Sequence, residues 1–460
     1  RRLCPGVRIS AWAAATYAVM PILTGAVGQG RVGTIGVAIV LPWAASAALS
    51  MGDASLERRR RGLWRTILGL GVVVAFAPAL GVLVVLAAIA LPALGGRAVS
   101  RWERVLLAVV PGLMSLAWLP TLVHHPQAGL LEAGRADYRI PHPDVWHLLA
   151  GSSGGPGAAP WWLIISLSGV AVLALIRQQT RRPVARMWSI AAAAAVGAAV
   201  LTQTRVDLPG LVDPVRPWPG AFLLVMSAAL IGAVALAAHG LVGAFSGVSF
   251  GWRQPVAAVG LLGALMVPVG GAVWWLVHGT DGPLERTRAQ VLPGYLTELG
   301  ANGRTGATLV IRGGNGAHGD RVTYRVVRGT AARLGDEGLL AVSEPDRDLT
   351  RAIAGVFAPN GVRAPATLAA RGIAYVYAPA PVSPTVTGAF DAADGFESAS
   401  APRPRTRTWQ VVSPVSVDAL DHRGDVSRPI LALLQVIVWV GVVVMAAPSR
   451  PQRLEGGGVA

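Results

Sequence analysis

Lysine is missing from this sequence of 460 residues, and cysteine occurs once, at Cys4. A single cysteine excludes an intrachain disulfide, a cysteine-based zinc site and an iron–sulfur cluster. Charged residues make up only 14% of the chain, against ~25% in ordinary soluble domains, and hydrophobic residues make up 53%. This composition excludes a disordered protein and an ordinary soluble enzyme as descriptions of the whole chain, and it indicates a membrane protein.

The positive charge lies between apolar runs rather than in one basic domain. The formal net charge is +16, yet residues 280–425 hold 16 arginines against 15 acidic residues, whereas the rest holds 24 against 9. Most of those 24 arginines fall in short clusters, at Arg1–Arg8, Arg58–Arg65, Arg97–Arg104, Arg177–Arg186, Arg253 and Arg450–Arg453. Cytoplasmic loops keep such an excess because these charges resist translocation. We therefore interpret the charge as a topology signal and expect no nucleic-acid binding.

Ten apolar runs approach the ~20 residues that a membrane-spanning helix needs, at 11–27, 33–51, 65–78, 79–96, 104–123, 161–176, 187–202, 220–245, 254–277 and 429–447. Ten crossings from a cytoplasmic Arg1 place every arginine cluster inside the cell. The two short runs around Pro78 are expected to form a hairpin, because the arginine clusters on either side of them should both be cytoplasmic.

The predicted fold is an α-helical polytopic membrane protein of about ten spans, with a small extracytoplasmic α/β domain inserted before the last span. The predicted segments are a transmembrane region 1–277 of about nine spans, with an outward loop 124–160, the α/β domain 278–428, a last transmembrane helix 429–447 and a cytoplasmic tail 448–460.

The predicted α/β domain has the charge density of a soluble protein. Helices are expected over Pro283–Leu299, with an interruption at Pro293, and over Asp346–Phe357 and Ala364–Arg371. Strands are expected over Ala307–Arg312, Val322–Val327, Ile373–Ala378 and Thr408–Val412, which predicts a sheet of three or four strands. Gly313–Gly316 lies between two strands and favours a hairpin loop over a nucleotide cradle. Ser398–Arg407 is expected to form a loop or to be partly disordered.

The outward loop 124–160 holds the candidate catalytic residues, which are Asp137, His142, Asp144 and His147. Carboxylate and imidazole groups can act as general bases toward a sugar hydroxyl, or bind a divalent metal. Their spacing matches no compact metal motif, so no metal site is predicted. The alternative is that these polar residues only form turns and keep a long loop solvated.

Arg31 is the predicted substrate-binding residue. It ends the short turn Gly28–Arg31 between the first two runs, on the side predicted to face outward. A guanidinium group suits the phosphate of a lipid or of a sugar diphosphate. The alternative is a solvated anchor at the membrane surface.

Several segments carry a family resemblance. Ala11–Leu49, with a Tyr-Ala-x-x-Pro segment and a glycine-rich turn, resembles a pair of spans in polyprenyl-phosphate-sugar-dependent glycosyltransferases of the GT-C architecture. Other blocks resemble the C-terminal membrane half of large actinobacterial-type glycosyltransferase family 2 membrane proteins, namely Phe250–Pro255, His278–Pro283, Val327–Gly329, Arg333–Gly335 and Leu368–Val376. In that family a cytoplasmic nucleotide-sugar transferase domain precedes many spans and a small outward α/β domain.

The resemblance implies a role in cell-envelope glycan assembly, but it assigns no catalytic residue here. The family 2 carboxylates, with their Asp-x-Asp metal motif, and the acidic residue in the first outward loop of GT-C enzymes would lie upstream of Arg1. We expect the chain to be part of a longer protein, because it starts without methionine and has no recognisable signal peptide. No cofactor is expected in this part, and a divalent metal would belong to the upstream domain.

The sequence thus predicts the membrane and extracytoplasmic portion of a cell-envelope glycosyltransferase in the cell membrane. This portion would handle a lipid-linked sugar donor or a growing glycan, and whether it is itself catalytic is left open. The expected partners are the lipid bilayer, a polyprenyl-phosphate-linked sugar or envelope glycan, and an envelope-biosynthesis protein. One alternative is a non-catalytic scaffold that binds an envelope partner. The other is a flippase or exporter of lipid-linked sugars, against which the scarcity of polar groups in the spans argues.

Overall fold

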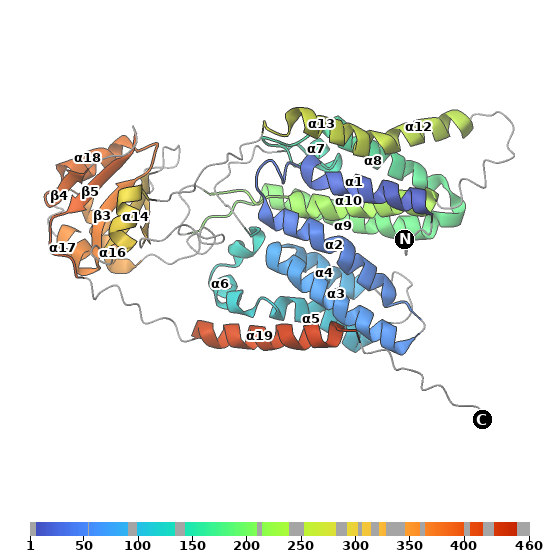
Figure 1. Ribbon diagram of the computed structural model, residues 1–460, viewed down its shortest axis with the longest axis horizontal. Coiled ribbons are helices and arrows are strands. Elements are labelled where there is room, and N and C mark those ends of the chain that lie inside the picture. Colours follow the sequence, from blue (N-terminus) through green and yellow to red (C-terminus); the bar gives the residue numbers. More distant parts are fainter. Residues whose placement is uncertain are drawn as a thin grey trace, which may run out of the picture.

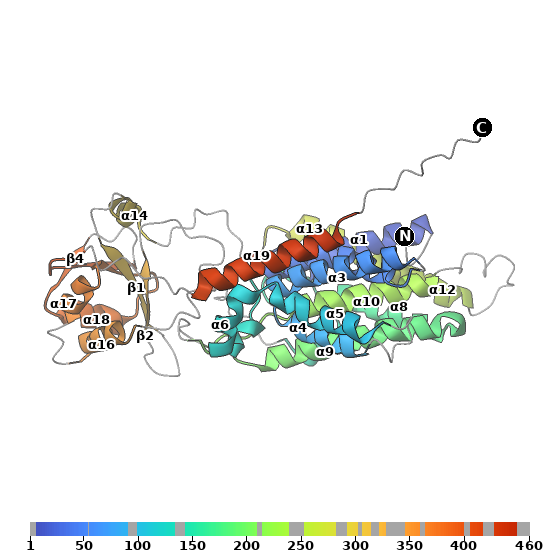
Figure 2. The same ribbon diagram turned by 90° about the horizontal axis from the view of Figure 1, so that it is seen from below.

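The computed structural model describes residues 6–53, 55–90, 99–133, 143–208, 214–238, 253–281, 292–301, 306–313, 322–327, 346–358, 364–399, 405–416 and 427–448. Its helices run back and forth along the long axis of the molecule, and a smaller unit of strands and short helices is drawn at one end of that axis (Figures 1 and 2).

The helical bundle is built from the segments on either side of this smaller unit. Its elements are α1 (Val7–Leu23), α2 (Val32–Ser50), α3 (Leu56–Phe76), α4 (Leu80–Ala90), α5 (Arg101–Leu113), η1 (Leu116–Trp118), α6 (Leu119–His124), η2 (Pro126–Leu130), α7 (Val145–Leu149), α8 (Trp161–Leu173), η3 (Ala174–Ile176), η4 (Gln178–Thr180), α9 (Arg181–Gln203), α10 (Gly220–Ala238), α12 (Arg253–Leu265), the π-helical turn η5 (Met266–Gly270), α13 (Gly271–His278) and, after the smaller unit, α19 (Ser427–Ala446).

The number of full-length spans in the described residues is smaller than ten. Five helices are long and apolar enough to cross a membrane, namely Val32–Ser50, Gln178–Gln203, Gly220–Ala238, Ala258–His278 and Pro429–Ala446. A sixth span results if α5 and α6, which are bent by 61° at their junction, count as one. Three other predicted runs correspond to shorter apolar helices, which are α1, α4 and α8 with η3. These apolar helices are consistent with a multi-pass membrane protein.

The helix α10 lies at the centre of the bundle and α19 at its edge. Within the most apolar window of each, 72% of the α10 residues are buried but only 11% of those in α19. The core around α10 is made by small and branched side chains of α1, α2, α8 and α9, with Met20, Leu23, Leu167, Ala194 and Leu223 among those buried. The outer side of α19 exposes Leu433, Ile437, Val440 and Val444. Such a surface suits the hydrocarbon core of a bilayer.

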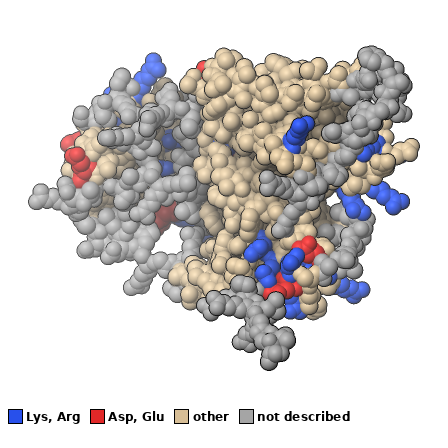
Figure 3. Space-filling view, turned by 45° about the vertical axis from the view of Figure 1, so that its right-hand side comes forward, with Lys and Arg blue, Asp and Glu red and all other residues tan. Residues whose placement is uncertain are grey.

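One end of the bundle carries arginine clusters. Arg59 Nη2 donates to Glu103 Oε2 at 2.7 Å, and Arg65 Nε donates to the carbonyl oxygen of Ala446 at 3.0 Å. The first turns of α3 and α5 therefore meet, and Arg65, farther along α3, contacts the last residue of α19. The chain must leave this end and return between α3 and α5, as the predicted hairpin around Pro78 requires. Figure 3 shows arginine atoms gathered toward the right and lower right, with a broad uncharged surface beside them.

The smaller unit is an α/β domain with a mixed sheet in the order β2-β1-β3-β5-β4. Its elements are α14 (Gly294–Ala301), β1 (Ala307–Gly313), β2 (Val322–Val327), α16 (Arg347–Val356), α17 (Ala364–Ala370), β3 (Ile373–Ala378), α18 (Pro384–Ala392), β4 (Phe396–Ala399) and β5 (Arg407–Val411). β1 and β3 are parallel, and the other neighbours are antiparallel. β1 and β2 thus pair as the predicted hairpin requires, although residues 314–321 between them lie outside the described residues.

Two predictions for this domain were wrong. The sheet has five strands rather than three or four, because β4 adds to the edge beside β5. Ser398 and Ala399 belong to β4 and not to a loop. The helix α18 was also missed. β4 has few β-branched or aromatic residues, so it is a strand because β5 provides its hydrogen bonds and not because of its own propensity. Of the predicted helix Pro283–Leu299, residues 283–291 lie outside the described part.

Both faces of the sheet are covered. On one face Trp409 and Phe390 are fully buried, with ring centroids 5.1 Å apart, and Leu349 of α16 and Leu368 of α17 join the same core. Trp409 Nε1 donates to Asp391 Oδ1 at 2.7 Å, so its one polar group is satisfied. On the other face α14 packs on Val310, Tyr375 and Tyr377.

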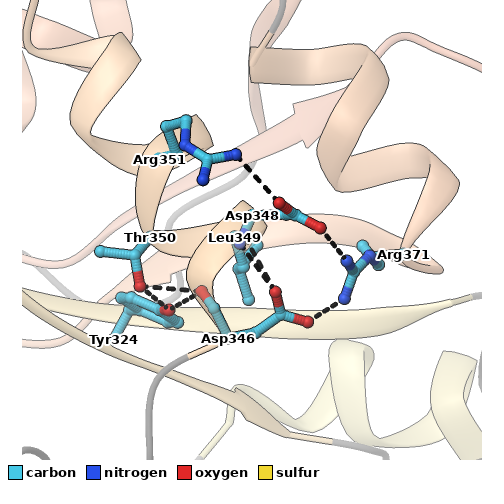
Figure 4. Close-up of polar contacts among 7 residues, drawn as sticks. All are labelled: Tyr324, Asp346, Asp348, Leu349, Thr350, Arg351 and Arg371. Atoms are coloured by element: carbon cyan, nitrogen blue, oxygen red, sulfur yellow. Dashed lines mark hydrogen bonds and ion pairs between the residues drawn. The ribbon is translucent and has the colours of Figure 1, made fainter.

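Charged side chains fix the start of α16 against the end of α17 (Figure 4). Asp346 Oδ1 accepts from the backbone amides of Asp348 and Leu349 at 2.9 and 3.3 Å, which caps α16. Arg371, two residues before β3, donates to Asp346 and to Asp348 Oδ2, the latter at 2.8 Å. Exposed ion pairs contribute about 0–1 kcal/mol each, so we assign this network a local orienting role.

Candidate functional site

The first turn of α2 meets two other parts of the bundle. The backbone amide of Gly33 donates to the carbonyl oxygen of Ala133 at 3.0 Å. The amide of Ala133 donates to the carbonyl oxygen of Phe76 at 2.8 Å. The segment that follows η2 is therefore held by its backbone between the start of α2 and the end of α3.

Gly33 allows this close approach. A Cβ atom added to Gly33 would lie 2.7 Å from the carbonyl oxygen of Phe76 and 2.9 Å from the Cβ and Oε2 atoms of Glu132. Since real side chains do not approach backbone atoms so closely, only glycine lets Glu132 lie against the first turn of α2.

Four side chains meet here, and we call them the Arg31 cluster: Arg31, Thr34, Glu132 and Trp218. Arg31 Nε lies 3.9 Å from Glu132 Oε1, and the two side chains are 6% and 8% exposed. Thr34 Oγ1 donates to Glu132 Oε2 at 2.6 Å and accepts from Trp218 Nε1 at 3.1 Å. The guanidinium carbon of Arg31 lies 4.8 Å from the centroid of the Trp218 ring, within the range of a cation–π interaction. The carboxylate is therefore oriented by Thr34 and faces a buried positive charge.

The environment of Glu132 changes its acidity. Burial raises the pKa of Glu132 from its ordinary 4.5 to about 7, although the hydrogen bond from Thr34 and the charge of Arg31 both lower it. A carboxyl group with a pKa near neutral pH is suited to take up a proton during a reaction.

A small pocket opens beside Glu132. Its volume is about 210 Å³ when the open solvent at its mouth is included, and it is lined by Ala77, Ala79, Leu130, Leu131, Glu132, Leu201, Trp218, Ala221 and Phe222. Pockets for whole small molecules are larger, at ~300–1,000 Å³. Inside its mouth this pocket has room for no more than about one water molecule, with one carboxylate and one indole among apolar walls.

The turn before Arg31 is held against the glycine-rich segment that precedes α8. Gln29 Nε2 donates to the carbonyl oxygen of Pro156 at 2.9 Å, and Ser153 Oγ donates to that of Thr24 at 2.5 Å. A Cβ on Gly28 would lie 3.3 Å from the backbone of Gly157. The backbone on both sides of Arg31 is thus fixed, which holds the guanidinium group in place.

The structure separates the predicted site residues. Arg31 belongs to the buried cluster, rather than forming a solvated anchor. Asp144 directly precedes the short helix α7, which carries His147; Asp144 Oδ2 lies 3.9 Å from His147 Nδ1, and the side chains are 82% and 40% exposed. Asp137 and His142 lie outside the described residues. Among the residues that are described, no group of three or more His, Cys, Asp or Glu side chains could hold a metal ion.

Glu132, Thr34 and Trp218 were not predicted as site residues. Glu132 is one of several acidic residues in the outward loop, and its sequence neighbours Leu131 and Ala133 do not distinguish it from Asp137 or Asp144. Its burial depends on backbone contacts with α2 and α3, which are distant in sequence. Thr34 and Trp218 carry no charge, so no composition or charge pattern selects them.

Comparisons with known proteins add no relative. No family model matches this chain, and neither a curated protein nor a solved structure is similar to it.

The raised pKa of Glu132 predicts a pH-dependent stability. The carboxyl group binds its proton more tightly in the folded protein than in the unfolded chain, so its contribution is full below about pH 4.5 and is lost as the pH rises through about 7. At ~1.4 kcal/mol per pKa unit, the loss is about 3 kcal/mol. Glu132→Gln should remove this part of the pH dependence, as measured by unfolding midpoints of the purified protein from pH 5 to 8.5. An unchanged pH profile in the variant would contradict the assignment.

Proposed function

We propose that this chain forms the membrane and extracytoplasmic part of a cell-envelope glycosyltransferase, and that a polyprenyl-phosphate-linked sugar binds at the Arg31 cluster. The observation that carries the proposal is the buried pair of Arg31 and Glu132 beside a pocket at a bundle end. Ionisable groups buried in a membrane protein are costly and commonly mark a substrate pathway or reaction site.

The proposed orientation follows from the arginines. The Arg58–Arg65 end of the bundle is cytoplasmic, because arginine is retained on that side. The chain leaves that end in α3, which ends at Phe76, and Phe76 is bonded to Ala133 beside the Arg31 cluster. The cluster is then extracytoplasmic, and so is the α/β domain. Ten crossings follow if the bent pair of α5 and α6 counts as one span and α3 and the shorter helices α1, α4 and α8 also span, with local thinning of the bilayer.

Each member of the charged pair has a chemical role in this proposal. The guanidinium group of Arg31 binds the phosphate of the lipid-linked donor through charge-assisted hydrogen bonds. An acceptor hydroxyl oxygen forms a bond to the anomeric carbon of the sugar, and the bond from that carbon to the phosphate oxygen breaks. The lipid phosphate leaves with the electron pair, and Glu132 takes the proton of the hydroxyl group.

The pocket is consistent with this chemistry. Leu130, Leu131 and Phe222 provide apolar walls next to Glu132, which exclude water and strengthen the electrostatic interactions inside. The pocket has room for no more than about one water molecule, so the sugar would bind at its mouth, next to Glu132.

A transfer assay tests the proposal. Membranes with the full-length protein are given polyprenyl-phosphate-linked hexoses and pentoses that carry a radiolabelled sugar, and incorporation into envelope glycan is measured. Glu132→Gln should reduce the rate by roughly 10²–10⁴-fold, the usual contribution of a general base. Glu57→Gln is the matched control, because Glu57 is an exposed carboxylate at the arginine end, and its rate should stay unchanged.

Two outcomes would overturn this assignment. If the unaltered protein transfers no sugar from any of these donors, the transferase is contradicted and the scaffold is favoured. If Asp144→Asn with His147→Ala abolishes transfer while Glu132→Gln does not, the reaction site lies in the outward loop instead of the Arg31 cluster.

A further inference from the structure

The junction of α5 and α6 leaves two backbone groups without their helical partners. In an uninterrupted α-helix the amide of Ala117 would donate to Leu113, and the carbonyl oxygen of Met114 would accept from Trp118. Here the chain bends by 61°, and the amide of Trp118 donates to Ser115 at 3.0 Å instead. Unpaired backbone groups are strongly unfavourable in a bilayer, so the bend needs partners from elsewhere.

The last helix provides both partners. Gln435 Oε1 accepts from the amide of Ala117 at 2.8 Å, and Trp439 Nε1 donates to the carbonyl oxygen of Met114 at 2.9 Å. The two residues are four positions apart and so lie on one face of α19. Gln435 is the one acidic, basic or amide side chain in residues 429–447, which indicates that its place in an otherwise apolar helix serves this bond.

The bend leads to the Arg31 cluster. After α6 the chain continues through η2, where Gln127 Oε1 accepts from the amide of Asp207 at 3.1 Å, and reaches Glu132. The direction of α6 therefore decides where η2 begins and how the Glu132 segment enters the space between α2 and α3. α19 is itself fixed at its far end by the bond from Arg65 to Ala446.

We propose that Gln435 and Trp439 are positioning residues: by bonding the bend between α5 and α6, α19 sets the placement of Glu132 against Arg31. The inference rests on the proposed function only in treating this cluster as the substrate site.

The test uses the full chain in lipid nanodiscs and needs no substrate. Gln435→Leu and the milder Trp439→Phe should raise amide hydrogen exchange at residues 114–118 by about fivefold or more, the change that the loss of one hydrogen bond of ~1 kcal/mol produces. Exchange at residues 126–133 should rise with it. Trp188→Phe is the matched control, because Trp188 Nε1 donates to the carbonyl oxygen of Ala171 at 3.0 Å, away from the bend; it should change neither segment.

A second measurement separates positioning from general weakening. In Gln435→Leu the pH midpoint of the Glu132-linked stability change should move from about 7 toward the ordinary 4.5, because a displaced Glu132 becomes more hydrated. A purely structural role would lower stability equally at every pH. Faster exchange confined to residues 114–118, with an unchanged pH midpoint, would overturn the proposal, and so would unchanged exchange at Ala117. Failure of sugar transfer would leave both readouts intact, so the two proposals fail separately.

Discussion

Arg31→Gln is expected to lower the free energy of unfolding by about 3–5 kcal/mol at pH 8, because it leaves the Glu132 carboxylate buried without its countercharge. The effect should be smaller at pH 6. There Glu132 is protonated in the variant, since losing the neighbouring cation raises its pKa above the value of about 7 that it has beside Arg31. The double variant Arg31→Gln with Glu132→Gln should recover most of the loss at pH 8.

An exposed ion pair gives the control for this variant. Arg61 pairs with Glu57 on the first turns of α3, where the side chains are 27% and 67% exposed. Arg61→Gln should cost no more than about 1 kcal/mol. Unfolding midpoints in detergent at pH 6 and pH 8 give the comparison. Equal small losses for Arg31 and Arg61 would mean that water reaches the Arg31 cluster, and the argument for a functional site would lose its basis.

The same variant tests ligand binding. Arg31→Gln should weaken binding of polyprenyl phosphate by about 10- to 150-fold, because a hydrogen bond to a charged group contributes ~1.5–3 kcal/mol. Binding of the uncharged polyprenol should not change. Native mass spectrometry of the protein in lipid nanodiscs measures both lipids in one sample.

Much of the fold could be predicted from the sequence because its signals are local. The strands β2 and β3 have the predicted boundaries, since Val322–Val327 and Ile373–Ala378 are short runs rich in β-branched and aromatic residues. The apolar runs correspond to helices in the same way. β4 was not predicted, because it forms a strand only through its pairing with β5.

The candidate site was only partly predictable. Arg31 could be selected because a single arginine among apolar spans is conspicuous. Its partner Glu132 could not be selected from the sequence, because only burial distinguishes it from the other carboxylates of the loop. That burial comes from the backbone bonds of Ala133 to Gly33 and Phe76. Sequence spacing does not predict such contacts, because they join segments that are far apart in the chain. Loop composition directed attention to Asp144 and His147, which are exposed instead.

The orientation of the bundle has an all-or-none test. In a Cys4→Ser background, Thr385→Cys places a thiol on the exposed side of α18, and Asp53→Cys places one before α3 at the arginine end. A membrane-impermeant maleimide should label position 385 completely in intact cells and position 53 only after permeabilisation. This follows because the arginines near Asp53 resist translocation, and an odd number of crossings separates the two positions in the ten-span topology.

The reverse labelling pattern would place the α/β domain and the Arg31 cluster in the cytoplasm. Nucleotide sugars would then be accessible to the site, and a carrier lipid on the outer face would not. A cytoplasmic enzyme with a surface cysteine, labelled in the same cells, shows whether the membrane stayed intact. Equal labelling at 385 and 53 with that control unlabelled would mean an even number of crossings between them, and one of the shorter helices, α4 or α8, would then lie along the membrane instead of crossing it.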